Sequence, residues 1–221
     1  MVILGIVFGL FFIYRSRKTK AKLLTFLGLA NILAGLMFLG VFLDFLSVLI
    51  LQQNMPNDSG IVAILSYIWF APVIITSMYI GAELLTPKLK MYIIIVILII
   101  SIIFEIIIFI SPLQSFNFIP TPPLVPEINL IDYNVNLFTL AGYLMGGLLF
   151  SVLFFLGFGF IYKGFQSSGV IRKNFLYLSA GSICFCVFGL LEGLTVPGFL
   201  VIFVRIGYLS SFWLMYLGLK S

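Results

Sequence analysis

Histidine is absent from this 221-residue chain, and charged residues make up only 9% of it. Without histidine the chain has no axial ligand for a His-bound haem and lacks the usual zinc and di-iron ligand sets. Cysteine is scarce as well: Cys184 and Cys186 lie two residues apart in an apolar run, would point to different faces of a helix, and are not expected to form a disulfide. We expect no metal centre and no other cofactor.

The sequence also lacks the residue patterns of known catalytic machinery. It contains no nucleophile–base arrangement, no Gly-rich phosphate loop and no pair of acids at a fixed short spacing. We therefore expect no enzymatic activity. The net charge of +5 comes from basic residues in short connections between apolar runs, so nucleic acid is not an expected partner.

Hydrophobic residues dominate the chain at 62%, far above the composition of an ordinary soluble domain. An apolar run of about 20 residues crosses the hydrocarbon core of a membrane. We predict an all-α polytopic membrane protein with a single domain, 1–221, located in the plasma membrane. Its seven transmembrane helices are expected near 1–14, 23–51, 61–83, 91–111, 137–162, 175–194 and 199–219. The first run lacks a basic start and a cleavage site, so we interpret it as a short membrane helix and not as a signal peptide.

The basic residues predict how these helices are oriented. All but one of the 12 Lys and Arg residues fall in the first, third and fifth connections or at the C-terminus. The positive-inside rule places these segments in the cytoplasm, so the N-terminus is expected outside and the C-terminus inside. The exception is Arg205, which lies within the last apolar run.

Four ionisable residues inside the predicted spans form the candidate functional site. At a rise of about 1.5 Å per residue, Asp44, Glu105, Glu192 and Arg205 reach a similar depth in the outer half of the membrane. Each costs about 2.5–3.5 kcal/mol to insert, so each needs a partner or a function. In one interpretation the acids receive a cationic or polyhydroxyl ligand that Arg205 orients. In the other, Arg205 forms a structural ion pair with Glu192 or Asp44.

Three aromatic residues are further candidates for a ligand pocket at this depth. Tyr208 lies one turn after Arg205 on the same helix face, and Trp69 and Tyr143 reach a similar level. Aromatic belts at membrane interfaces explain Trp and Tyr residues equally well. The connection 112–136, which contains five prolines, is either an ordinary tether or a lid over the pocket.

A faint internal repeat relates the two ends of the chain. Aligning "FIY" at 12–14 with "FIY" at 160–162 places Asp44 opposite Glu192, and "MYIG" in the third run corresponds to "MYLG" in the seventh. An odd number of spans between the copies gives them the same orientation. The pattern favours a parallel 3+1+3 repeat of the kind found in some transporters.

In span number and length the chain resembles SWEET-type sugar transporters, microbial rhodopsins and, more distantly, G-protein-coupled receptors. It also resembles the seven-span sensor regions of prokaryotic histidine kinases and small archaeal membrane proteins. The resemblance covers architecture and not motifs. The Pro-Gln dipeptides of the SWEET and PQ-loop families are absent, and 199–219 contains no lysine to hold retinal.

The sequence thus favours a membrane sensor or receptor-like protein with a ligand pocket in the outer half of the bundle. Its expected partners are membrane lipids, a small-molecule ligand and a separate cytoplasmic signalling protein. One alternative is a small-solute transporter of SWEET-like architecture, although the cytoplasmic half has few polar residues. Another is a structural bundle or assembly partner.

Overall fold

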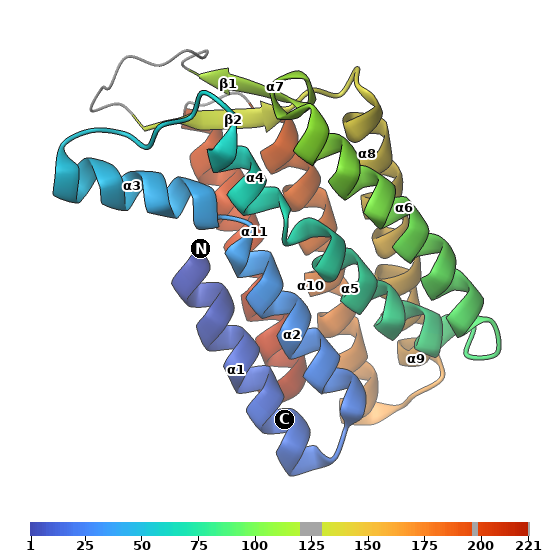
Figure 1. The fold of residues 1–221 in the computed structure, drawn as a ribbon. Helices are drawn as coiled ribbons and strands as arrows, with labels where there is room; N and C mark the ends of the chain where they lie inside the picture. Colours follow the sequence, from blue (N-terminus) through green and yellow to red (C-terminus); the bar gives the residue numbers. More distant parts are fainter. Residues whose placement is uncertain (120–129, 196–198, 221) are drawn as a thin grey trace.

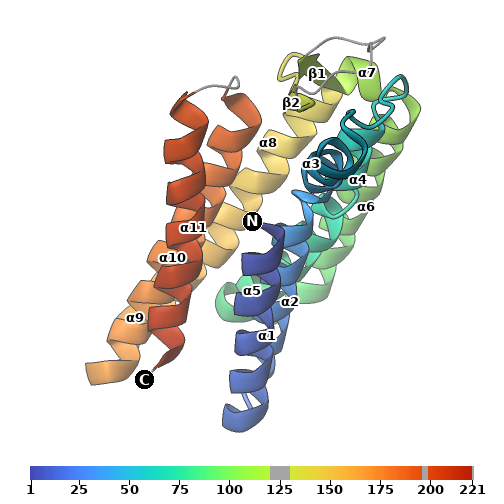
Figure 2. The same ribbon diagram turned by 90° about the vertical axis from the view of Figure 1, so that its left-hand side faces the viewer.

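A computed structural model describes residues 1–119, 130–195 and 199–220 as a bundle of helices topped by a two-stranded hairpin (Figures 1 and 2). The expected all-α architecture is confirmed for these residues. In chain order the elements are α1 (Val2–Thr19), α2 (Lys22–Leu36), α3 (Leu39–Leu51), α4 (Ile61–Tyr67), α5 (Phe70–Leu85), α6 (Lys90–Ile110), α7 (Pro112–Ser115), β1 (Phe116–Ile119), β2 (Asp132–Val135), α8 (Leu140–Val152), the π-helical segment η1 (Leu153–Phe158), α9 (Gly159–Phe165), α10 (Gly169–Leu194) and α11 (Phe199–Lys220).

Within the described residues, five helices are long and apolar enough to cross a membrane. They are Ile61–Leu85, Lys90–Ile110, Leu140–Phe165, Gly169–Leu194 and Phe199–Leu219. α2 and α3 together form a sixth candidate, although a bend of 43° separates them. α1 is not among these spans, because Arg15, Arg17 and Lys18 occupy its last turns. The structure therefore supports a membrane protein; a seventh span and the internal repeat remain predictions.

The two ends of the bundle differ in charge. The turn between α1 and α2, the connection between α9 and α10 and the C-terminus lie at one end, which we call the basic end (Figure 1). The hairpin of β1 and β2 and the connection between α3 and α4 lie at the opposite end, which we call the hairpin end. The hairpin end carries Asp58 and Asp132, whereas Arg17, Lys18 and Arg172 belong to the basic end.

A bend interrupts the run 23–51, for which the sequence predicts one continuous helix. α3 turns away from α2 and lies across the hairpin end of the bundle (Figure 1). Gly40 allows α3 to approach α4 closely, because a Cβ atom there would collide with the carbonyl oxygen of Val62. The Gly40 backbone N–H also donates to the Ser66 hydroxyl at 3.0 Å. This contact between α3 and α4 determines the direction in which α3 runs after the bend.

The run 61–83 is broken as well, between α4 and α5. Pro72 has no N–H, and in a continuous helix its ring would clash with the carbonyl of Ile68 four residues earlier. The first N–H groups of the new helix have no partner within it. One of them, on Ala71, donates to Glu105 Oε1 of α6 at 3.4 Å.

The connection 112–136 contains a hairpin that was not predicted from the sequence. β1 pairs with β2 in antiparallel fashion, with Phe116 opposite Val135 and Ile119 opposite Asp132. Phe116 and Phe118 are buried, so this part of the connection packs on the bundle. Four of its five prolines lie in 120–129, outside the described residues.

Candidate functional site

A cavity lies in the half of the bundle near the hairpin, between the start of α3 and elements α4, α5, α8, α10, α11 and β2. The empty volume of this cavity is about 930 Å³, a value that includes the open solvent at its mouth. The charged and tyrosine side chains that line it are Tyr67, Asp132, Tyr133, Glu192, Arg205 and Tyr208. Toward the middle of the bundle its walls are apolar, with Phe70, Ile74, Val152 and Phe185. We call this space the hairpin-end cavity.

The central polar feature of the cavity is an ion pair between α10 and α11. Arg205 Nε donates to Glu192 Oε1 at 3.0 Å. The second carboxylate oxygen, Glu192 Oε2, is buried and has no hydrogen-bond partner among the described residues. Arg205 makes no other hydrogen bond within the described part of the chain. The pair is thus only half satisfied by the protein.

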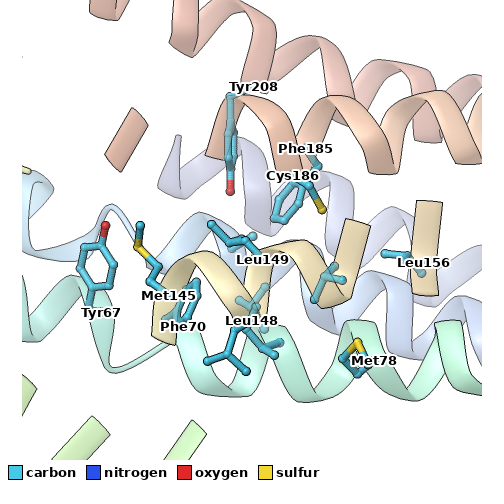
Figure 3. Close-up of a cluster of buried hydrophobic side chains, with 14 of the residues drawn as sticks. Tyr67, Phe70, Met78, Met145, Leu148, Leu149, Leu156, Phe185, Cys186 and Tyr208 are labelled. Atoms are coloured by element: carbon cyan, nitrogen blue, oxygen red, sulfur yellow. The ribbon is translucent and has the colours of Figure 1, made fainter. Parts of the chain in front are cut away.

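Two tyrosines from opposite sides of the cavity direct their hydroxyls into it. Tyr208 extends from α11 and Tyr67 from α4, and both hydroxyls point toward the space beside Leu149 and Met145 of α8 (Figure 3). The two side chains are only 4% and 9% exposed. Within the described ranges neither hydroxyl has a hydrogen-bond partner. A tyrosine hydroxyl can both donate and accept a hydrogen bond, so these two groups offer hydrogen-bonding capacity to the cavity.

The β2 strand of the hairpin forms part of the cavity wall. The ring of Tyr133 lies 6.2 Å from that of Tyr67 and 5.8 Å from that of Phe116. Burial raises the pKa of the Tyr133 hydroxyl above its ordinary value, so this group stays protonated. Asp132 Oδ1 accepts the backbone N–H of Tyr133 at 2.8 Å. Asp132 and Tyr133 thus make β2 part of the cavity wall.

The lining carries more negative than positive ionisable groups. Two carboxylates, Asp132 and Glu192, face one guanidinium, Arg205, which leaves the lining with a net charge of −1 when all three are ionised. Aromatic rings surround these charges: Tyr208 contacts Phe38 at 5.6 Å and Phe185 at 5.0 Å between ring centroids. Aromatic faces combined with a carboxylate bind ammonium groups, because the ring quadrupole and the anion both attract a cation.

Asp44 has a different role from the one expected. Its side chain is 0% exposed and does not line the cavity. One carboxylate oxygen accepts the backbone N–H of Met55 at 2.7 Å, and the other accepts that of Ile131 at 2.8 Å. Asp44 thereby ties α3 to the α3–α4 connection and to the segment that enters β2. We call this contact the Asp44 junction.

Three further candidates also lie outside the cavity lining. Glu105 contacts the backbone at the α4–α5 break, and the indole Nε1 of Trp69 is buried without a partner in the described chain. Tyr143 is 67% exposed on the outer surface of α8, as expected of a residue that faces a membrane interface. Of the predicted residues, the structure brings together Glu192, Arg205 and Tyr208.

Sequence reasoning missed Tyr67, Asp132 and Tyr133, which complete the polar lining. Comparisons with known proteins add nothing to this assignment: no protein family model, no curated protein and no solved structure matches the chain. The site is therefore interpreted from its own geometry.

Proposed function

We propose that the protein is a seven-span receptor-like sensor of the plasma membrane, with the hairpin end outside and the basic end in the cytoplasm. The segregation of basic residues supports this orientation. α1 and the bent α2–α3 pair complete the seven spans. The observation that carries the proposal is the hairpin-end cavity, into which a half-satisfied ion pair and two unpartnered tyrosine hydroxyls are directed.

The ligand is a small cation with an apolar body. Its ammonium group binds between Glu192, Asp132 and the rings of Tyr67 and Tyr208, and its apolar part extends toward Phe70 and the middle of the bundle. A buried site of this kind is mostly apolar with a few placed polar groups, which is typical of small-molecule pockets.

Binding is coupled to the basic end through α11. A cation that attracts Glu192 weakens the contact between Glu192 and Arg205, and this changes how α11 sits against α10. At the other end of α11, Arg15 of α1 donates two hydrogen bonds to the carbonyl oxygen of Leu219, at 2.7 and 3.1 Å. A ligand with different affinities for two positions of α11 would shift this equilibrium. The exposed basic residues of the α1–α2 turn offer the contact surface for a separate acidic signalling partner.

A transporter is the second candidate, because a second cavity lies at the basic end. It is lined by apolar residues of α2, α5, α9 and α10, among them Leu27, Ile80, Phe160, Phe175 and Leu178. We call it the basic-end groove. On α5, Ile74 of the first cavity and Ile80 of the groove are separated by about 9 Å at the helical rise of 1.5 Å per residue.

Buried Met78 and Leu156 lie in the layer between these two cavities. A closed layer fits a receptor, and it also fits one state of an alternating-access transporter. The two proposals differ in whether the layer opens.

Paired probes of opposite charge test the proposal. Phenyltrimethylammonium and benzenesulfonate share a ring and carry permanent charges of opposite sign. We expect the cation to raise the unfolding temperature of the purified protein and the anion to leave it unchanged, because a ligand that binds only the folded state stabilises it. Stabilisation by the anion alone would contradict the ligand assignment. Uptake of the cation into proteoliposomes would replace the receptor with the transporter.

A further inference from the structure

The basic-end groove is open to the surface, but several of the side chains that line it are buried in the bundle. Leu27, Ile80 and Leu178, which line it, are only 2%, 1% and 4% exposed. By contrast, Met91 and Tyr92 on the outer face of α6 are 61% and 71% exposed. The empty volume of the groove is about 780 Å³, a value that includes the open solvent at its mouth. A molecule held there is bound between four helices and is not merely adjacent to the protein.

The chemistry of the lining is nearly all hydrocarbon. Apart from Lys22, every lining residue is apolar: Ala21, Leu23, Leu24, Leu27, Ile80, Leu84, Phe160, Phe175, Leu178. Such a cavity offers no polar group deep inside to orient a sugar, a nucleotide or a peptide backbone. An alkyl chain is the ligand that this lining can accept without leaving polar atoms unpaired.

Basic residues surround the end of the groove that faces the basic end of the bundle. Lys22 begins α2 and lines the groove itself. Lys163 follows Phe160 by three residues on α9, and Arg172 precedes Phe175 by three residues on α10. Residues three apart share a helix face. The rings of Phe160 and Phe175 lie 6.3 Å apart, so α9 and α10 pack together there. Lys163 and Arg172 lie about one turn beyond these rings toward the basic end, next to the lining and not within it.

No carboxylate neutralises this set of cations within the described chain. Lys163 donates to the Gln166 side chain at 3.4 Å, and the Arg172 guanidinium lies over the Phe165 ring at 5.8 Å. Glu83, the one described acid at this end, is paired with Lys90 at 2.8 Å. Lys22, Lys163 and Arg172 therefore remain available to an anion.

We propose that the basic-end groove is a binding site for an anionic phospholipid. One acyl chain enters the space between α2, α5, α9 and α10, and the phosphate is held by Lys22, Lys163 and Arg172. An apolar slot beside a set of cations without acidic partners matches the two parts of such a lipid, and basic pockets between membrane helices are suited to anionic headgroups. This site shares no residue with the hairpin-end cavity and does not depend on the ligand proposed there.

Lipid retention measures the site directly. The protein is placed in nanodiscs that contain equal amounts of phosphatidylglycerol and phosphatidylcholine with the same acyl chains, and retained lipid is counted by native mass spectrometry. We expect one phosphatidylglycerol to be retained with a preference of about tenfold or more, since each nearby basic residue adds attraction for an anionic lipid. Equal retention of the two lipids by the wild type would overturn the proposal.

Two matched triple variants separate the site from general surface attraction. Lys22→Gln/Lys163→Gln/Arg172→Gln removes the proposed phosphate ligands, whereas Arg17→Gln/Lys18→Gln/Lys173→Gln removes the same charge from exposed positions that are not proposed to bind the phosphate. The first should lower the preference about tenfold, and the second should change it by less than about twofold. An equal loss in both variants would overturn the proposal.

A cavity-filling variant tests the acyl-chain part of the proposal. Leu27→Trp places a larger side chain in the groove and should abolish retention of the bound lipid, whatever its headgroup. Circular dichroism and gel filtration identify a variant that fails to fold, in which case the charge variants decide. A folded Leu27→Trp protein that retains phosphatidylglycerol like the wild type would overturn the proposal.

Discussion

The hairpin end contains two acidic residues, Asp44 and Glu192, that the sequence places at a similar depth and the structure places in different surroundings. At the Asp44 junction, both carboxylate oxygens accept backbone N–H groups at 2.7 and 2.8 Å. In the hairpin-end cavity, Glu192 uses one oxygen to pair with Arg205 at 3.0 Å, and its other oxygen has no partner in the described chain. One acid is saturated by the protein itself, and the other retains bonding capacity.

This difference separates a structural charge from a candidate ligand-binding charge. A buried carboxylate that accepts several backbone N–H groups is stabilised as the anion and holds the chain segments that donate to it. A buried oxygen without a partner costs stability, and Glu192 Oε2 is such an atom. The hydroxyls of Tyr67 and Tyr208 face the same cavity. The cost is consistent with a site that is completed by a ligand.

The largest effect is expected at the Asp44 junction. Asp44→Ala leaves the N–H groups of Met55 and Ile131 without acceptors, and we expect the free energy of unfolding to fall by about 3–5 kcal/mol. Thermal or denaturant unfolding in detergent measures the loss. Binding of phenyltrimethylammonium per folded molecule should stay within about twofold of wild type, because Asp44 is not part of the cavity. A variant as stable as the wild type would show that the junction is unimportant.

The next effect concerns affinity at Glu192. Glu192→Gln keeps the size of the side chain and removes the charge that attracts the ligand. We expect phenyltrimethylammonium to bind about tenfold more weakly, since the cation loses its nearest anion. Calorimetric titration gives the dissociation constant, and Glu105→Gln, which removes an acid outside the cavity, is the matched control. Equal affinities for the wild type and Glu192→Gln would count against the cavity as the binding site.

Arg205 should change affinity in the opposite direction. Arg205→Gln removes a positive charge that repels a cationic ligand and competes with it for Glu192. We expect phenyltrimethylammonium to bind about threefold more tightly, while the free energy of unfolding falls by about 1–2 kcal/mol because Glu192 loses its partner. Opposite changes in Glu192→Gln and Arg205→Gln identify a cationic ligand. Weaker binding in both variants would indicate a ligand that needs both charges.

The smallest effect is expected from a tyrosine hydroxyl. Tyr208→Phe keeps the ring and removes the unpartnered hydroxyl, so binding of phenyltrimethylammonium should weaken about two- to threefold. The free energy of unfolding should change by less than about 0.5 kcal/mol, because the hydroxyl faces the cavity and makes no hydrogen bond within the described chain. Tyr143→Phe, on the exposed face of α8, is the control and should change neither quantity. A clear loss of stability in Tyr208→Phe would mean that its hydroxyl has a structural role.

The positions of most apolar helices along the chain could be predicted, and the basic residues could be assigned to one end, because both signals are local. Apolar run length identifies a membrane helix, and basic residues identify one end of it. The bends could not be predicted in the same way. Gly40 is visible in the sequence, but α3 turns where it does because Ser66, 26 residues away, accepts its N–H and Val62 leaves no room for a Cβ atom.

For the candidate site, the depth of each ionisable residue along its helix could be predicted. The side of the helix toward which its side chain points could not. The sequence offered Glu192 and Asp44 as alternative partners for Arg205, and the structure pairs it with Glu192. Asp44 has a similar depth in a straight helix, but the bend before α3 carries it to Met55 and Ile131 instead. Tyr67 was missed because a tyrosine in an apolar run is also typical of a membrane belt.

One experiment tests the central distinction most directly: stability and phenyltrimethylammonium affinity measured together for the wild type, Asp44→Asn and Glu192→Gln. Both substitutions replace a buried acid with its amide. We predict that Asp44→Asn lowers the unfolding temperature and leaves the dissociation constant of the folded protein nearly unchanged. Glu192→Gln should weaken binding about tenfold with little change in stability. Loss of stability without loss of binding in Glu192→Gln would contradict the account, because Glu192 would then be structural like Asp44.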